Sequence, residues 1–154
     1  MTEATWRTVI LATLDTVTNI GITEDYARYA NELTALYDRY KTTISGTAQL
    51  RGWNIGLESV ASEQLAIRHR VRRTLTFKIR GYLSLDDSAA TEKTMSALAE
   101  AVLNALDDDA TLHAQTADAG RAQLIVMEHR TFAGVLCHYV EITQKVAEVR
   151  TATA

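Results

Sequence analysis

Apolar and polar residues alternate over residues 67–85 more regularly than elsewhere in the chain. One row is mostly apolar and consists of Ile67, His69, Val71, Leu75, Phe77, Ile79, Leu83 and Leu85, with Arg73 and Gly81 interrupting it. The other row is polar and consists of Arg68, Arg70, Arg72, Thr74, Thr76, Lys78, Arg80, Tyr82 and Ser84. A period of two is typical of a strand with one buried face. At about 3.3 Å per residue such a strand spans roughly 60 Å, which exceeds the width of a small domain.

A shorter alternation precedes this strand. Trp53, Ile55 and Leu57 alternate with polar or small residues, which predicts a partner strand. We therefore expect a long hairpin over residues 50–85, with its tip near the sequence VASEQLA standing clear of the core. Hairpins that leave a domain usually pair with another chain, because bare strand edges invite strand addition.

Three segments have the apolar spacing of amphipathic helices. The first has one apolar side and ends where Gly21 would stop a helix; that side consists of Trp6, Val9, Ile10, Leu14, Val17 and Ile20. The second, with Thr23 as its cap, would align Tyr26, Tyr29, Ala30, Leu33, Tyr37 and Tyr40, although tyrosine also suits strands. The third, capped by Asp87 or Ser88, would align Met95, Leu98, Ala99, Val102, Leu103 and Leu106.

The remaining segments complete the predicted fold. The polar segment 42–49 is expected to be a loop, and the β-rich runs 121–132 and 134–146 to form a tight hairpin. Aspartates at 107–109 would oppose the dipole of the third helix, so we end that helix near Leu106 and expect a solvated loop. The order of elements predicts an α+β fold, with an antiparallel sheet of about four strands and helices on one face. No repeat, linker or proline divides the chain, which favours a single domain over residues 1–154.

Composition narrows the classes of function. The formal net charge of −3 argues against a dedicated nucleic-acid-binding protein, which is usually strongly basic. The single cysteine, Cys137, excludes an intrachain disulfide and favours a reducing compartment such as the cytoplasm. No segment has the pattern of a signal peptide or the ~20 apolar residues of a membrane span, so we expect a soluble protein.

Signals of enzymatic chemistry are weak, and we expect no catalytic, cofactor-binding or metal-binding residues. The sequence has no phosphate-binding loop, dinucleotide-binding motif, nucleophile elbow or HExxH motif. Cys137 is interpreted as a small residue of a strand. His129 and His138, with Glu128 nearby, would make a metal site only if their side chains shared a face, and a structural role is favoured. His69 is placed at the edge of the core or in a subunit contact.

The basic row has two interpretations. It could bind phosphates as a β-ribbon does, or its arginines could pair with Glu58, Glu63 or carboxylates of a neighbouring subunit. The acidic total charge favours protein contact. The tyrosines of the second segment are likewise typical of an interface. The predicted interface residues are Trp53, Arg68, Arg70, Arg72, Arg73, Lys78, Arg80, Tyr26, Tyr29, Tyr37 and Tyr40.

These features together resemble a known family. The sequence RGWNIGLES, the strand and helix FKIRGYLSLDDSAATEKTMSALAEAVLNAL, and the run FAGVLCHYVEIT resemble the tail-terminator and related tail-completion proteins of long-tailed bacteriophages and prophages. The resemblance covers residues 26–146 and includes a tryptophan strand, a Gly-Tyr strand end before an acidic turn and helix, and a terminal hairpin. It includes no catalytic signature.

The resemblance implies a virion protein, made in the host cytoplasm, that assembles as a ring, typically a hexamer. Such a ring caps the head-proximal end of the tail tube, stops tube polymerisation and presents a surface to the head-side connector. Its implied partners are copies of itself, the tube protein and the connector, and DNA passes through it without sequence-specific binding. Two alternatives remain open: a neck or stopper protein on the head side, and a small-molecule-binding α+β domain.

Overall fold

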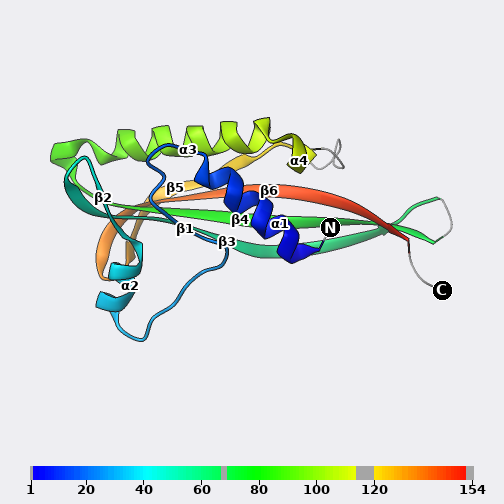
Figure 1. Ribbon diagram of the computed structural model, residues 1–154, viewed down its shortest axis with the longest axis horizontal. Coiled ribbons are helices and arrows are strands. Elements are labelled where there is room, and N and C mark those ends of the chain that lie inside the picture. Colours follow the sequence, from blue (N-terminus) through cyan, green and yellow to red (C-terminus); the bar gives the residue numbers. More distant parts are fainter. Residues whose placement is uncertain (1, 67–68, 114–119, 152–154) are drawn as a thin grey trace.

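A long, twisted, mostly antiparallel sheet forms the body of the molecule (Figure 1). The computed structural model describes residues 2–66, 69–113 and 120–151. Within these ranges the sheet has six strands in the order β1-β3-β4-β6-β5, and β2 pairs with β3 outside this path. The α+β class is therefore confirmed, with more strands than the four expected.

The helices and strands have the following bounds. The helices are α1 (Glu3–Asp15), α2 (Leu33–Tyr40), the short 3₁₀ helix η1 (Asp87–Ala89), α3 (Thr91–Asp108) and α4 (Ala110–His113). The strands are β1 (Ile22–Glu24), β2 (Lys41–Ile44), β3 (Thr47–Gln64), β4 (Arg70–Ser84), β5 (Gln123–Phe132) and β6 (Val135–Thr151).

Strand β4 lies at the centre of the sheet and is paired on both sides along nearly its whole length. It is antiparallel to β3 on one side and to β6 on the other. The predicted alternation is confirmed, because Leu75, Phe77, Ile79 and Leu83 are buried on one face. The polar row lies on the opposite face and is half-buried from Arg72 to Ser84.

Helices α1, α3 and α4 cover the apolar face of β3, β4 and β6 and close the main core. Trp6 and Leu14 of α1 and Met95 and Val102 of α3 are fully buried there. The indole of Trp53 lies against Gly81 on the neighbouring strand, where an added Cβ would come within 2.7 Å of the ring. Gly81 therefore interrupts the apolar row because the tryptophan occupies the space of its side chain.

Helix α2 packs on the other face of the sheet, so the prediction that all helices share one face is wrong. Tyr40 and Leu50 are fully buried there, in a second cluster with Ala133 and Cys137. The ring of Phe132 stacks on Tyr82 with centroids 4.0 Å apart. This small cluster covers only one end of the second face.

The structure corrects three predictions for residues 22–49. Thr23 lies in β1, parallel to β3, and its hydroxyl donates to Asp15 at 2.5 Å instead of capping a helix. The second helix begins only at Leu33, so the tyrosines do not form one helical row. The expected loop 42–49 is a hairpin, in which Ser45 and Gly46 take the two positive φ angles of a tight two-residue turn.

Two helix ends also differ from the prediction. Helix α1 ends at Asp15, and Val17 and Ile20 are buried in the segment that follows. Neither Asp87 nor Ser88 caps α3, whose N-cap position is Ala90 and has no side-chain hydrogen bond. Asp86 instead caps η1, because its Oδ1 accepts from the amide of Ala89. Helix α3 continues to Asp108. Over the described parts of the chain, no helix combines the length and the hydropathy needed to cross a membrane.

The contact between Trp53 and Gly81 gives a direct test of the fold. Substituting Gly81→Ala forces a methyl group into a rigid ring, so we expect the free energy of unfolding to fall by about 1–3 kcal/mol. Gly56→Ala is the matched control, because only the end of the flexible Arg80 side chain stands in the way of the new methyl group. Urea unfolding of both variants measures the difference, and equal losses would contradict the assigned packing.

Candidate assembly interface

The end of the β3–β4 hairpin carries a long run of exposed strand residues. We define the hairpin end as residues 57–64 of β3 and 70–77 of β4. Every residue of its β3 half is exposed, whereas the β4 half is half-buried or buried beyond Arg70. Strand β6 also reaches this end, since Thr151 pairs with Arg70. The sequence predicted a two-stranded hairpin, and the structure adds this third strand.

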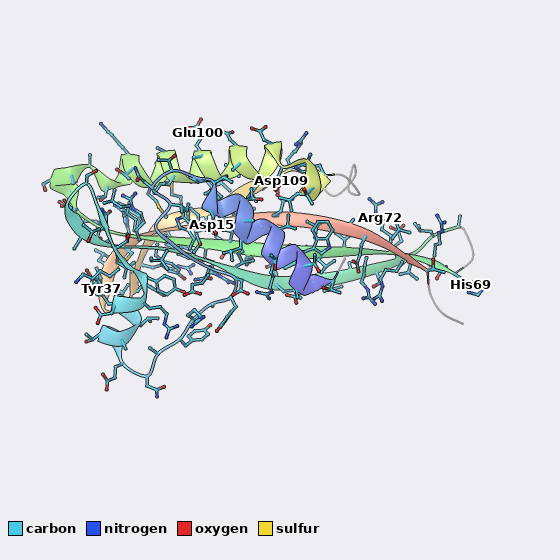
Figure 2. The ribbon with its side chains drawn as sticks, viewed as in Figure 1. Asp15, Tyr37, His69, Arg72, Glu100 and Asp109 are labelled. Atoms are coloured by element: carbon cyan, nitrogen blue, oxygen red, sulfur yellow. The ribbon has the colours of Figure 1, made fainter. Side chains whose placement is uncertain are left out.

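Three arginines of the predicted interface lie along this end. Arg70 is exposed, while Arg72 and Arg73 are half-buried. Figure 2 shows Arg72 on the strand and His69 at its end. His69 is exposed, with a φ of 63°, so it does not lie at the edge of the core. Arg68 falls outside the described residues.

Two further residues of the basic row are paired within the chain. The ammonium group of Lys78 lies 2.9 Å from carboxylate oxygens of both Glu58 and Glu141. Arg80 lies 4.0 Å from Glu141. The interpretation named arginines as the partners of Glu58, whereas in the structure the lysine of the row, Lys78, pairs with it. Both cations therefore neutralise carboxylates of their own sheet.

Glu141 is the centre of this charge cluster, and it is largely buried. The hydroxyl of Tyr139 donates to its Oε2 at 2.8 Å. Burial alone raises the pKa of this carboxyl, but the hydrogen bonds from Lys78 and Tyr139 outweigh it and leave the pKa below its usual value. The pKa of Lys78 is raised, chiefly by its hydrogen bond to Glu58 and then by that to Glu141.

The predicted aromatic interface residues separate into two groups. Trp53 and Tyr40 are fully buried in the two cores, which corrects their assignment to the surface. Burial of these large rings stabilises the subunit itself. Tyr37 is half-buried beside the second core, on α2 (Figure 2). Tyr26 and Tyr29 are 49% and 84% exposed in the irregular segment before α2, where they are available for contact.

His129 and His138 face each other across β5 and β6, as the sequence suggested. Their rings lie 5.0 Å apart, and the hydroxyl of Thr91 lies 2.9 Å from Nε2 of His138. They border a pocket of about 360 Å³ that also includes Glu92. Glu128 is absent from this pocket, because it is next in the strand and pairs with Arg130. The described residues contain no group of three potential metal ligands.

The environments of His138 and Cys137 match structural roles. Burial, followed by the neighbouring His129, lowers the pKa of His138, and Glu92 acts in the opposite direction. Burial raises the pKa of the Cys137 thiol to about 11, so the thiolate form is scarce at neutral pH. Neither group has the features of an activated nucleophile or base.

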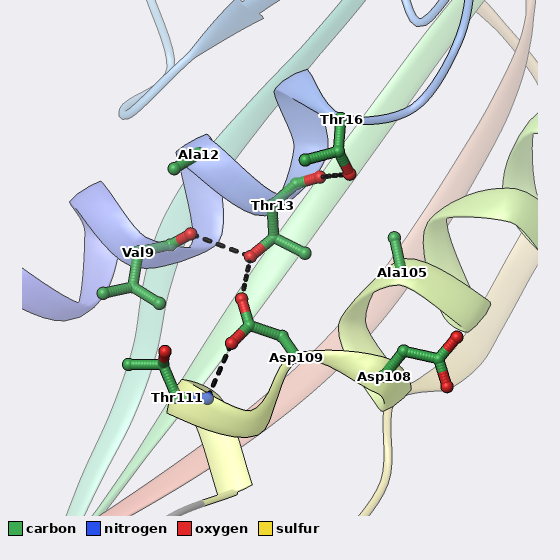
Figure 3. A pocket seen from close by; sticks show the side chains of 8 residues that line it. All are labelled: Val9, Ala12, Thr13, Thr16, Ala105, Asp108, Asp109 and Thr111. Atoms are coloured by element: carbon green, nitrogen blue, oxygen red, sulfur yellow. Dashed lines mark hydrogen bonds between the residues drawn. The ribbon is translucent and has the colours of Figure 1, made fainter.

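A shallow groove of about 600 Å³ separates α1 from the end of α3 and from α4 (Figure 3). Its lining is small and mostly uncharged. Asp109 accepts hydrogen bonds from the Thr13 hydroxyl and, at 2.8 Å, from the amide of Thr111. The prediction that residues 107–109 form a solvated loop is therefore wrong: Asp107 and Asp108 continue α3, and Asp109 is half-buried and joins α1 to α4. Among the described residues that line this groove, no acid and base converge.

The outer edge of β5 is a surface that the sequence analysis missed. Leu124, Ile125, Met127 and, on β6, Leu136 are between 40% and 53% exposed. No described strand pairs with this edge. The signal in the sequence was the continuous apolar run from Leu124 to Met127, which does not alternate as a half-buried strand should.

Comparison of the sequence with models of protein families gave no match, and comparison with curated proteins gave none either.

The Glu141 cluster predicts a pH-dependent contribution to stability. Because the pKa of Glu141 is lower in the folded than in the unfolded chain, its contribution is complete above the ordinary carboxylate range and is lost as the pH falls through the folded value. We expect Glu141→Gln to lower the free energy of unfolding by about 1–3 kcal/mol at neutral pH, since the amide has no charge with which to pair Lys78 and Arg80. Denaturation across pH measures this difference, which should shrink in acid.

The matched control for this prediction is Glu100→Gln, on the exposed side of α3 (Figure 2). It removes the same charge without removing a described ion pair. A Glu141→Gln loss that stays constant from neutral to acidic pH would contradict the assigned role of the carboxylate.

Proposed function

We propose that this chain is a tail-terminator protein of a long-tailed bacteriophage or prophage. In this role it assembles as a ring, in the hexamer typical of the family that it resembles, on the head-proximal end of the tail tube. The ring ends tube polymerisation and provides the surface that joins the head-side connector. The chain is then a virion protein made in the host cytoplasm, and it acts through surface contact without a catalytic step.

One observation carries this proposal beyond the resemblance. The exposed end of the β3–β4 hairpin presents eight consecutive exposed residues of β3, from Leu57 to Gln64, on a strand without a partner on its outer side in the described structure. Exposed edges of this length are usually blunted or covered in monomeric proteins, because they pair with other chains. In our proposal this hairpin end projects from the core and contacts a neighbouring subunit or the tube.

The two faces of the sheet also suit a capping role. Helices α1, α3 and α4 cover one face, while α2 covers only one end of the other. A terminator must match the tube on one side and must not repeat that surface on the other, or polymerisation would continue. A subunit with two chemically different faces meets this requirement.

Deleting the gene from its phage tests the proposal directly. We expect electron microscopy of the resulting particles to show tails of uncontrolled length that are not joined to heads, because nothing then limits tube growth. Tails of normal length beside heads that have lost their DNA would overturn the terminator role and assign the chain to the head-side stopper. Normal infectious particles would overturn both virion roles.

Reversing charges at the hairpin end tests its part in assembly. We expect the double substitution Arg70→Glu and Arg72→Glu to abolish ring formation while the subunit stays folded, because the polar row there becomes acidic. Complementation of the deletion and the circular dichroism of the purified variant report on these two properties.

The control reverses Lys93 in the first turn of α3 and Lys41 at the start of β2, two exposed lysines, and therefore makes the same change in net charge. Both of these segments lie at the end of the molecule away from the hairpin end (Figure 1). It is expected to complement the deletion. Unimpaired assembly of the Arg70 and Arg72 variant would remove these arginines from the interface.

A further inference from the structure

Apart from the outer edges of the short strands β1 and β2, two longer strand edges are unpaired in the described parts of the chain, and they belong to different strands. Strand β5 has β6 on one side and no described strand on the other. Strand β3 pairs with β2 and β1 only as far as Asn54. Arg7 covers the next position by donating to the carbonyl of Ile55 at 3.0 Å. From Gly56 to Gln64, β3 is bonded to β4 alone.

The hydrogen-bond pattern shows which backbone groups these edges offer. In an antiparallel pair, successive residues bond alternately to the partner and away from it. The amide of Leu65 donates to Arg70 at 3.0 Å, so Val60, Ser62 and Gln64 direct their amides outward. On β5, the two-residue turn pairs Phe132 with Val135 and leaves the amides of Met127, His129 and Thr131 outward.

The side chains of the two edges match in character. On the face that carries α1 and α3, the β3 edge exposes Leu57 and Val60, and the β5 edge exposes Leu124 and Met127. Val60 is 49% exposed and Met127 is 42% exposed. Pairing the two edges in register on this face would remove both apolar sets from water.

The directions of the strands fit a rotational assembly. Three antiparallel pairings lead from β3 through β4 and β6 to β5, so β5 runs antiparallel to β3 within one subunit. A neighbour in the same orientation therefore brings its β3 antiparallel to this β5, which is the more stable type of pairing. Contact between two different edges repeats around a ring, whereas a two-fold contact stops at a dimer.

The edges do not lie at the same level along the strands. Gln123, the first residue of β5, pairs with Thr143 of β6, which pairs with Lys78 of β4. Lys78 in turn pairs with Gly56 of β3, so Gln123 and Gly56 lie at the same position along the strands. The β5 edge extends from that level towards the start of β3, and the free β3 edge extends the other way. Neighbouring subunits must then be staggered along the strands, as the tilted strands of closed sheets are.

A two-fold contact between β3 edges is disfavoured by charge. Both charged residues of the free β3 edge, Glu58 and Glu63, are acidic. Although Lys78 already pairs with Glu58, a two-fold contact would place two acidic edges side by side. A two-fold contact between β5 edges would leave the β3 edges unpaired. Pairing of β3 with β5 is the arrangement that covers both the free β3 edge and the outer β5 edge.

We propose that the chain associates with a second copy of itself by adding the β3 edge, residues 56–64, to the outer edge of β5 in the neighbouring subunit. This inference rests on the proposed function for the closure of the ring, and it specifies the contact that holds the ring together. Its partner is another copy of this chain in the same orientation.

Two single substitutions block the two edges separately. Proline at Ser62 or at Met127 removes an outward amide without removing a bond to β4 or β6. We expect Ser62→Pro and Met127→Pro each to be monomeric, and an equimolar mixture to form a one-to-one heterodimer and nothing larger, because one intact β3 edge and one intact β5 edge remain. Native mass spectrometry and sedimentation velocity measure these states, with Ser62→Ala and Met127→Leu as controls that assemble like the wild type.

The outcomes separate this contact from the proposed function. A dimer of either proline variant alone would overturn the inference in favour of a two-fold contact. A wild-type chain that stays monomeric, or proline variants that assemble like the wild type while remaining folded by circular dichroism, would overturn it as well. These results leave the terminator role intact, since that role is decided by the length of tails in the gene deletion.

Discussion

The pairing of β4 with β3 on one side and β6 on the other is the interaction on which the rest of the structure depends. It fixes the register of the three longest strands and so aligns their apolar residues on one face. A slip of one residue would turn Leu75, Phe77 and Ile79 away from α1 and α3. Helices α1 and α3 would then pack on a polar row of β4, and the pairing partners along the sheet would change.

The same pairing explains why the basic row is less available than its sequence implies. In the middle of the sheet, cations meet acidic residues from both neighbouring strands, as Lys78 meets Glu58 and Glu141. A central strand thus has its charges satisfied locally, and the groups available for assembly move to the edges and to the hairpin end. The assembly contact we infer accordingly uses backbone groups and aliphatic side chains more than arginines.

The long alternating strand, the first helix, the third helix and the final hairpin could be predicted because each has a period that local sequence determines. Residues 22–49 could not be predicted, because β1 and β2 are short and owe their structure to pairing with β3. A pattern read over a few neighbouring residues does not contain that pairing. Trp53 and Tyr40 were assigned to an interface from their residue type. Their burial depends on Gly81 and Gly52, whose missing side chains leave room for the rings.

The position of β6 in the chain has a consequence for folding. This strand follows all the other described elements in sequence, yet it supplies Val140, Ile142 and Val146 to the core and completes the register of β4. During synthesis the core on β3 and β4 therefore stays incomplete until β6 has been made, so folding depends on contacts between residues distant in sequence. A truncated chain cannot present a finished edge strand, so only subunits that have been translated through β6 are competent to enter an assembly.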